Sequence, residues 1–159
     1  MKKFLLSLVA IVIFFTGNFI DAEEESEVTN VGNGNYEAFA VEVLNLVNAE
    51  RANIGVAPLR LADDLQEATA IRAREIVEVF SHTRPDGSDC FTVMRSRGRT
   101  CGENIAAGHA SASETVEQWM NSEGHRENIL NPDFRELGVG YAYEDYSTYH
   151  HYWVQLFRG

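Results

Sequence analysis

The C-terminal end of the chain constrains the fold most, because there the hydrophobic pattern changes from helical spacing to alternation. Residues 136–143 (ELGVGYAY) alternate larger side chains with Gly138, Gly140 and Ala142, and residues 150–157 (HHYWVQLF) are rich in aromatic and β-branched residues. Both patterns are typical of β-strands. Since only a short polar segment separates the two runs, we predict an antiparallel hairpin.

Helical spacing dominates the chain before this hairpin. Apolar residues recur at helical intervals over 36–53 and 63–80, and Asp63 is placed to cap the second of these helices. Ser111 and Glu114 form a capping-box pattern that starts a further helix. Helices followed by an antiparallel ribbon give an α+β fold in which the helices cover the sheet.

The N-terminal end has the pattern of a secretory signal peptide. Lys2 and Lys3 precede an apolar run over 4–15, and the small residue Ala22 stands before an acidic stretch. The run is shorter than the roughly 20 residues that a membrane span needs. We therefore predict cleavage after Ala22, which makes 1–22 the signal peptide. An uncleaved N-terminal anchor is the alternative.

The rest of the chain divides into two parts. Residues 23–35 are acidic, contain Gly and Asn, and lack periodicity, which predicts a flexible leader. Residues 36–159 then form one domain, because 159 residues with 45% hydrophobic side chains suffice for a single core. Export would place this domain outside the cell or in the periplasm, with no membrane span left after cleavage.

The formal net charge of −11 excludes two classes of partner. Phosphate backbones and anionic bilayers both require a basic face, so we expect neither nucleic-acid nor membrane-surface binding. Cleavage of the signal peptide would remove both lysines and one aspartate and leave a charge of −12. An acidic protein of this kind suits a cation better than an anionic partner.

Cys90 and Cys101 are the only cysteines of the chain. In an oxidising compartment, two cysteines without a competitor most simply form one disulfide. Closing this ring would stabilise the fold by about 3 kcal/mol on the loop-entropy estimate. A two-cysteine metal site, the alternative, usually has closer spacing.

Histidines beside turns and glycines are the remaining candidates for chemistry. His82 lies in a turn-rich loop, and His109 and His125 each follow a glycine. Two imidazoles with a carboxylate are a common zinc ligand set, although no HExxH motif fixes one here. The alternative is that these histidines donate hydrogen bonds that hold loops. The chain has no GxSxG motif, which disfavours a serine hydrolase.

Five motifs occur in order along the chain: FSHTRPDGSDCF (80–91), GENIAAG (102–108), VEQWMNSEGHRENILNP (116–132), ELGVGYAY (136–143) and YWVQLF (152–157). They resemble the successive signatures of the CAP superfamily, which comprises cysteine-rich secretory proteins, antigen 5 and pathogenesis-related 1 proteins. The match is to its bacterial extracellular, SCP-like branch. The similarity covers the whole predicted domain.

The resemblance implies a three-layer α-β-α sandwich with an antiparallel central sheet. It also implies a cleft in which His82, Glu103 and His125 bind Zn²⁺ or another divalent cation. Many eukaryotic relatives have a further glutamate where this chain has Ser122. The adjacent Glu123 is the candidate for that fourth position. The predicted disulfide would tether the loop after His82 to the strand that carries Glu103.

The function implied by this resemblance is a secreted, monomeric CAP domain whose cleft binds a divalent cation or small ligand. The family has no settled catalytic activity, and a fold does not fix a function. One alternative is a zinc-dependent hydrolase of peptide or cell-envelope substrates with Glu103 or Glu123 as general base. Another is an interaction module with a vestigial cleft that recognises an extracellular protein or a lipid.

Overall fold

The computed structural model describes residues 24–159, with side chains from Glu37 onward. The predicted signal peptide over 1–22 lies outside the described residues. In chain order the elements are α1 (Glu24–Asn53), β1 (Arg60–Leu61), α2 (Asp63–Glu78), the 3-10 helix η1 (Cys90–Val93), β2 (Cys101–Ala107), α3 (Ala112–Met120), α4 (Glu123–Leu130), β3 (Glu136–Tyr143) and β4 (His151–Arg158). No helix in this part of the chain has both the length and the apolar character needed to cross a bilayer.

The predicted C-terminal hairpin forms the centre of the sheet. Strands β3 and β4 pair antiparallel from Glu136 opposite Arg158 to Tyr143 opposite His151. Strand β2 pairs antiparallel with the other side of β4, and the two-residue β1 pairs parallel with the start of β3, which gives the order β1-β3-β4-β2. Strand β2 is therefore one edge of the sheet, and β3 forms most of the other.

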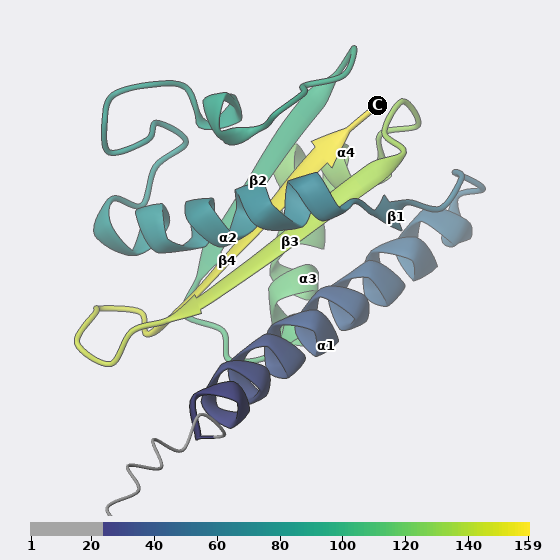
Figure 1. Cartoon of the computed structure of the whole chain (residues 1–159). Coiled ribbons are helices and arrows are strands. Elements are labelled where there is room, and N and C mark those ends of the chain that lie inside the picture. The colour runs from purple at the N-terminus through teal and green to yellow at the C-terminus, as the bar shows by residue number, and fades with distance from the viewer. Residues whose placement is uncertain (1–23) are drawn as a thin grey trace, which may run out of the picture.

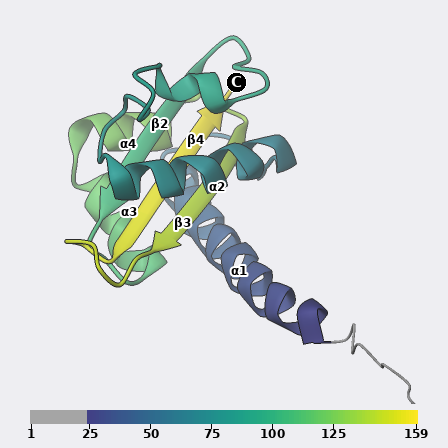
Figure 2. The same cartoon turned by 60° about the vertical axis from the view of Figure 1, so that its left-hand side comes forward.

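Helices cover both faces of this sheet, which confirms the three-layer α-β-α sandwich. Helix α2 packs on one face and α1, α3 and α4 pack on the other (Figures 1 and 2). The alternation in β4 explains the two cores: Trp153 and Phe157 join the core under α1 and α3, whereas Val154 and Leu156 join the core under α2. The alternation of side chains along β4 thus contributes residues to the cores on both faces of the sheet.

The small residues of β3 allow α2 to lie directly on the sheet. A Cβ added at Gly138 would approach the Leu65 carbonyl oxygen to 2.5 Å, and one at Gly140 would clash with the Thr69 carbonyl. Both glycines face α2, where the helix backbone takes the space of their side chains. The alternation noted in the sequence therefore serves close helix packing as well as strand formation.

The ends of the helices differ in part from the predictions. The backbone of residues 24–35 belongs to α1, although we predicted a flexible leader there. The N-cap of α2 is Ala62, not Asp63, and Asp63 is already the first helical residue. The capping box of α3 is confirmed, because the Ser111 side chain accepts from the Glu114 amide.

A fully buried arginine fixes the far end of α4. The Arg51 guanidinium donates to the carbonyls of Ala57 at 2.8 Å, Ile129 at 2.7 Å, Asn131 at 2.9 Å and Phe134 at 3.2 Å. The C-terminal turns of α1 and α4 are thereby joined through one side chain. Burial, and then the charge of Arg135, lower the pKa of Arg51.

Candidate functional site

The site is built on β2, where alternation places successive residues on opposite faces of the sheet. Glu103 faces the α2 layer and its side chain is only 1% exposed. Asn104, the next residue, faces the α4 layer and is fully buried. Because β2 is an edge strand, groups from both layers can meet beside it.

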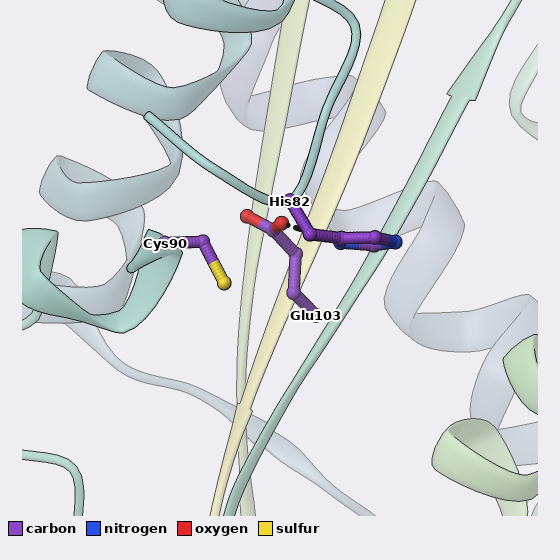
Figure 3. A group of neighbouring side chains, drawn as sticks. All are labelled: His82, Cys90 and Glu103. Carbon is purple, nitrogen blue, oxygen red and sulfur yellow. Dashed lines mark hydrogen bonds and ion pairs between the residues drawn. The ribbon is translucent and has the colours of Figure 1, made fainter. Parts of the chain in front are cut away.

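His82 reaches Glu103 from the loop that follows α2. Its Nδ1 lies 2.8 Å from Glu103 Oε1, and its side chain remains 57% exposed (Figure 3). The loop is pinned on both sides of His82: Ser81 accepts through its carbonyl from Arg72 at 2.8 Å, and the His82 carbonyl accepts from the Cys90 amide at 3.2 Å. His82 is therefore held at one atom and open to solvent elsewhere.

Arg72 supplies the charge that holds Glu103 ionised. Its Nε donates to Glu103 Oε2 at 2.8 Å and its Nη2 to Oε1 at 3.2 Å, and the arginine is fully buried. Burial alone would raise the pKa of Glu103, but hydrogen bonds from His82 and Arg72 outweigh it and hold that pKa below its ordinary value. An ionised carboxylate only accepts, so His82 Nδ1 must carry the proton.

A second carboxylate completes the charge balance around Arg72. Glu75 Oε2 accepts from Arg72 at 2.7 Å, and its Oε1 accepts from Arg84 at 2.5 Å. Burial would raise the pKa of Glu75, but the bonds from Arg84 and Arg72 lower it. Two arginines and two glutamates thus form one neutral network, which connects α2 to β2 and to the His82 loop.

The predicted Cys90–Cys101 disulfide is absent, because both residues are free thiols. The buried Cys90 thiol lies within 4.8 Å of a Glu103 carboxylate oxygen, and the two side chains are neighbours in Figure 3. Burial first, and then the charge of Glu103, raise the pKa of Cys90 to about 12. The prediction was wrong because spacing in the sequence does not report which groups surround each thiol; Cys90 lies among the side chains of His82 and Glu103.

His125 approaches the same edge from the other layer. Its carbonyl accepts from Asn104 Nδ2 at 3.0 Å, and Asn128 donates to Asn104 Oδ1 at 2.9 Å. These bonds hold the start of α4 against β2. Burial, and then the charge of His82, lower the pKa of His125. His125 Nδ1 is buried with no hydrogen-bond partner among the described residues.

The predicted cation ligands therefore differ in whether they still have a lone pair that no hydrogen bond uses. Within the described part of the chain, neither His82 Nε2 nor His125 Nδ1 has a hydrogen-bond partner, so both imidazoles can offer a lone pair. Glu103 cannot do so easily, because both oxygens already accept from Arg72. Glu123 is exposed at the start of α4, and no hydrogen bond or ion pair with another described residue joins it to the site.

A tighter cluster contains Cys90. Ligand atoms of His82, Cys90 and Glu103 lie within 4.8 Å of one another. A cation among them would have to displace the His82 proton and the thiol proton and then lie beside the Arg72 guanidinium. Like charges at such distances repel strongly in a buried place. The donors suit a metal by type, but Arg72 disfavours one at this point.

Sequence reasoning missed Arg72, Asn104 and Asn128. The signal for Arg72 is its place on α2, where it falls on the apolar face with Leu65, Ala68 and Ile76. A charged residue on such a face must find a partner when the helix packs. Asn104 alternates with Glu103 on β2 and so had to point into the opposite layer.

Comparisons with known proteins agree with this architecture. The family model described as CAP: Cysteine-rich secretory protein family matches residues 44–157. The uncharacterized protein YkwD of Bacillus subtilis (strain 168) is 38% identical over 141 residues, which cover 86% of this chain and 53% of YkwD. The chain thus spans about half the length of that relative.

Solved structures show the same fold. An extracellular protein containing an SCP domain from Bacillus anthracis superposes with a TM-score of 0.67 at 28% identity, over 78% of this chain and 41% of that one. An outer surface protein from Borrelia burgdorferi has a TM-score of 0.61 at 19% identity, over 87% of this chain and 94% of that one. With its ordered motifs, three-layer sandwich and family match over 44–157, the chain belongs to the CAP family of cysteine-rich secretory proteins.

Proposed function

We propose that this CAP domain acts outside the cytoplasm and binds a divalent cation, with zinc as the best match, between His82 and His125. The observation that carries the proposal is the hydrogen bond from His82 Nδ1 to the ionised Glu103, because it leaves Nε2 as a lone-pair donor. Metal-binding histidines commonly donate their other nitrogen to a carboxylate in this way. Glu103 is then the residue that orients a ligand.

The second histidine supports the same proposal. His125 Nδ1 lacks a partner among the described residues, and the lowered pKa of His125 keeps its ring neutral to more acidic pH than usual. A neutral imidazole is the form that binds zinc. A bound zinc ion would supply a Lewis acid with open positions for water or ligand. Protein groups would contribute two nitrogens, and Asn104 and Asn128 would hold the His125 side in place.

The hydrolase alternative lacks a free general base. Both oxygens of Glu103 accept from Arg72, and Oε1 also accepts from His82, so its carboxylate has little capacity left to take a proton from water. Glu123 is exposed and, among the described residues, has no contact that would orient it. We therefore favour binding over hydrolysis.

Calorimetric titration of the purified chain with Zn²⁺ tests the proposal. Wild type should bind one ion, and His82→Ala and His125→Ala should each weaken binding at least tenfold. Glu103→Gln should weaken it by about 10–100-fold, the usual effect of losing an orienting partner. His109→Ala is the matched control, since the only described hydrogen bond of this histidine is through its backbone carbonyl. Equal affinity in wild type and both site variants would refute the proposal.

A further inference from the structure

The edge of the sheet opposite the histidines is mostly unpaired. Strand β1 pairs with β3 only at Glu136 and Leu137. From Gly138 to Tyr143 no strand of the described chain lies on that side of β3. A cavity of about 350 Å³ follows this free edge. It lies where β1 would continue if it were longer, in the space that α1 and α2 flank in Figure 1.

Helix α2 forms one wall of this slot. Because α2 lies directly on Gly138 and Gly140, the residues on its outer side overhang the strand edge. These are Gln66, Ala70 and Arg74, spaced four residues apart and therefore aligned on one face of the helix. Ala70 is small and exposed, which leaves room beside the backbone of β3.

Helix α1 forms the opposite wall, with Glu37, Phe39 and Ala40. Phe39 packs on Tyr141 with ring centroids 5.0 Å apart, so the Phe39 part of this wall is apolar and fixed, whereas the exposed Glu37 adds a carboxylate at the start of the wall. The floor is the backbone of β3. The slot thus lies along a strand edge between residues of two helices, and its volume of about 350 Å³ is at the lower end of ligand sites.

The backbone edge already binds an amide carbonyl. The Val139 amide donates to Gln66 Oε1 at 2.6 Å, so a side-chain carbonyl occupies the place that a neighbouring strand's carbonyl would take. The edge is therefore competent to form ladder hydrogen bonds. A bound strand could replace Gln66 with little loss, because one amide carbonyl would substitute for another.

Arg74 gives the slot a charge preference. It lines the slot, is exposed, and has no ion pair or hydrogen bond with any described residue. Its planar fork of donors matches a carboxylate.

We propose that this slot binds an extended peptide by strand addition to β3, with an acidic side chain of the peptide paired to Arg74. Main-chain hydrogen bonds to β3 would supply affinity, and Arg74 with the small Ala70 would supply selectivity. A lipid chain fits less well, because the floor of the slot presents polar backbone groups. The site is separate from His82 and His125, which lie at the opposite edge of the sheet.

This proposal is tested by titrating the isotope-labelled full chain with a mixture of pentapeptides and recording its amide chemical shifts. The peptides have Glu at the central position, and their other positions are randomised. The mixture should perturb the amides of 139–143 and slow hydrogen exchange at 139, 141 and 143, whose amides point away from β4. Ala70→Trp, which fills the slot, and Arg74→Glu, which reverses its charge, should each weaken binding at least tenfold. Arg99→Ala, which removes an arginine outside the slot, should leave it unchanged.

Several results would overturn the proposal. The first is that the mixture leaves the amide shifts of 139–143 unchanged. The second is that the Ala70→Trp variant binds the peptides as tightly as wild type. The third is that wild type binds equally well to peptides with Gln in place of the central Glu. Exchange at 139, 141 and 143 that is already slow in the free protein, and becomes fast when residues 1–36 are removed, would show that the chain itself fills the slot. Zinc titration of Ala70→Trp should match wild type, so the two proposals can fail separately.

Discussion

Two fully buried arginines lie on opposite sides of the sheet, and their partners differ. Arg51 donates only to backbone carbonyls where α1 and α4 end. Arg72 donates to two carboxylates and one carbonyl, and one of those carboxylates holds His82. Arg51 therefore joins parts of the fold, whereas Arg72 connects the fold to the site. The difference between them can be tested by removing each charge in turn.

The largest effect is expected for Arg72→Met. The substitution leaves Glu103 buried without its main counter-charge, which typically costs about 3–5 kcal/mol of unfolding free energy. Urea unfolding measures this loss. The double variant Arg72→Met/Glu103→Gln should be markedly more stable than Arg72→Met, because no unpaired charge remains. A double variant no more stable than the single one would contradict the assignment of Glu103 as the critical partner.

Arg51→Met should destabilise somewhat less, by about 2–4 kcal/mol, because it leaves carbonyls rather than a charge unsatisfied. No single carboxylate substitution should rescue it. Where the variant folds, His82 should keep its protonation pattern, since Arg51 contacts no part of the Glu103 network. A changed His82 signal in folded Arg51→Met would remove the distinction between the two arginines.

Lowering the pH should destabilise the network around Arg72 before it affects the contacts of Arg51. The pKa values of Glu103 and Glu75 lie below their ordinary values in the folded chain, so the stabilisation they give is complete above the unfolded value. It is lost as pH falls through the folded values, below about 4.3, the usual value for glutamate. Urea midpoints between pH 7 and pH 3 should therefore fall less steeply in Glu103→Gln than in wild type. Parallel slopes would contradict this.

The smallest effect concerns the thiols. The purified protein, unfolded in the presence of a thiol reagent, should show two reactive thiols per chain. In the folded state Cys101 should react faster than Cys90, because Cys90 is buried and its pKa is raised to about 12. Cys101→Ser should change stability by less than about 1 kcal/mol. No reactive thiol after unfolding would mean that a disulfide forms after all.

The layers of the fold could be predicted from the sequence where local patterns determine them. Alternation over 136–143 and 150–157 predicted the hairpin, and the CAP motifs supplied the sandwich. The extension of α1 to Glu24 could not be predicted, because residues 24–35 have no periodicity to reveal a helix. The short β1 was also missed, since two residues carry no pattern.

The sequence named residues that lie at this edge of the sheet but not their connections, and their role as cation ligands stays a prediction. His82 and Glu103 meet as the motifs implied, and His125 approaches the same edge. Sequence patterns could not indicate which atoms are already engaged. Arg72 changes Glu103 from a free ligand into a saturated orienting group, and Cys90 lies beside that carboxylate as a free thiol. Such competition for one carboxylate depends on distances that spacing in the sequence does not encode.

The imidazole nitrogen signals of His82 test the central account most directly. Long-range proton–nitrogen correlation spectra at neutral pH distinguish the two tautomers. We predict that wild type holds the proton on Nδ1 and that Glu103→Gln or Arg72→Met shows a mixture, because the ionised carboxylate that fixes the tautomer is lost or disturbed. A proton on Nε2 in wild type would contradict the account, since that nitrogen could not then donate a lone pair to a cation.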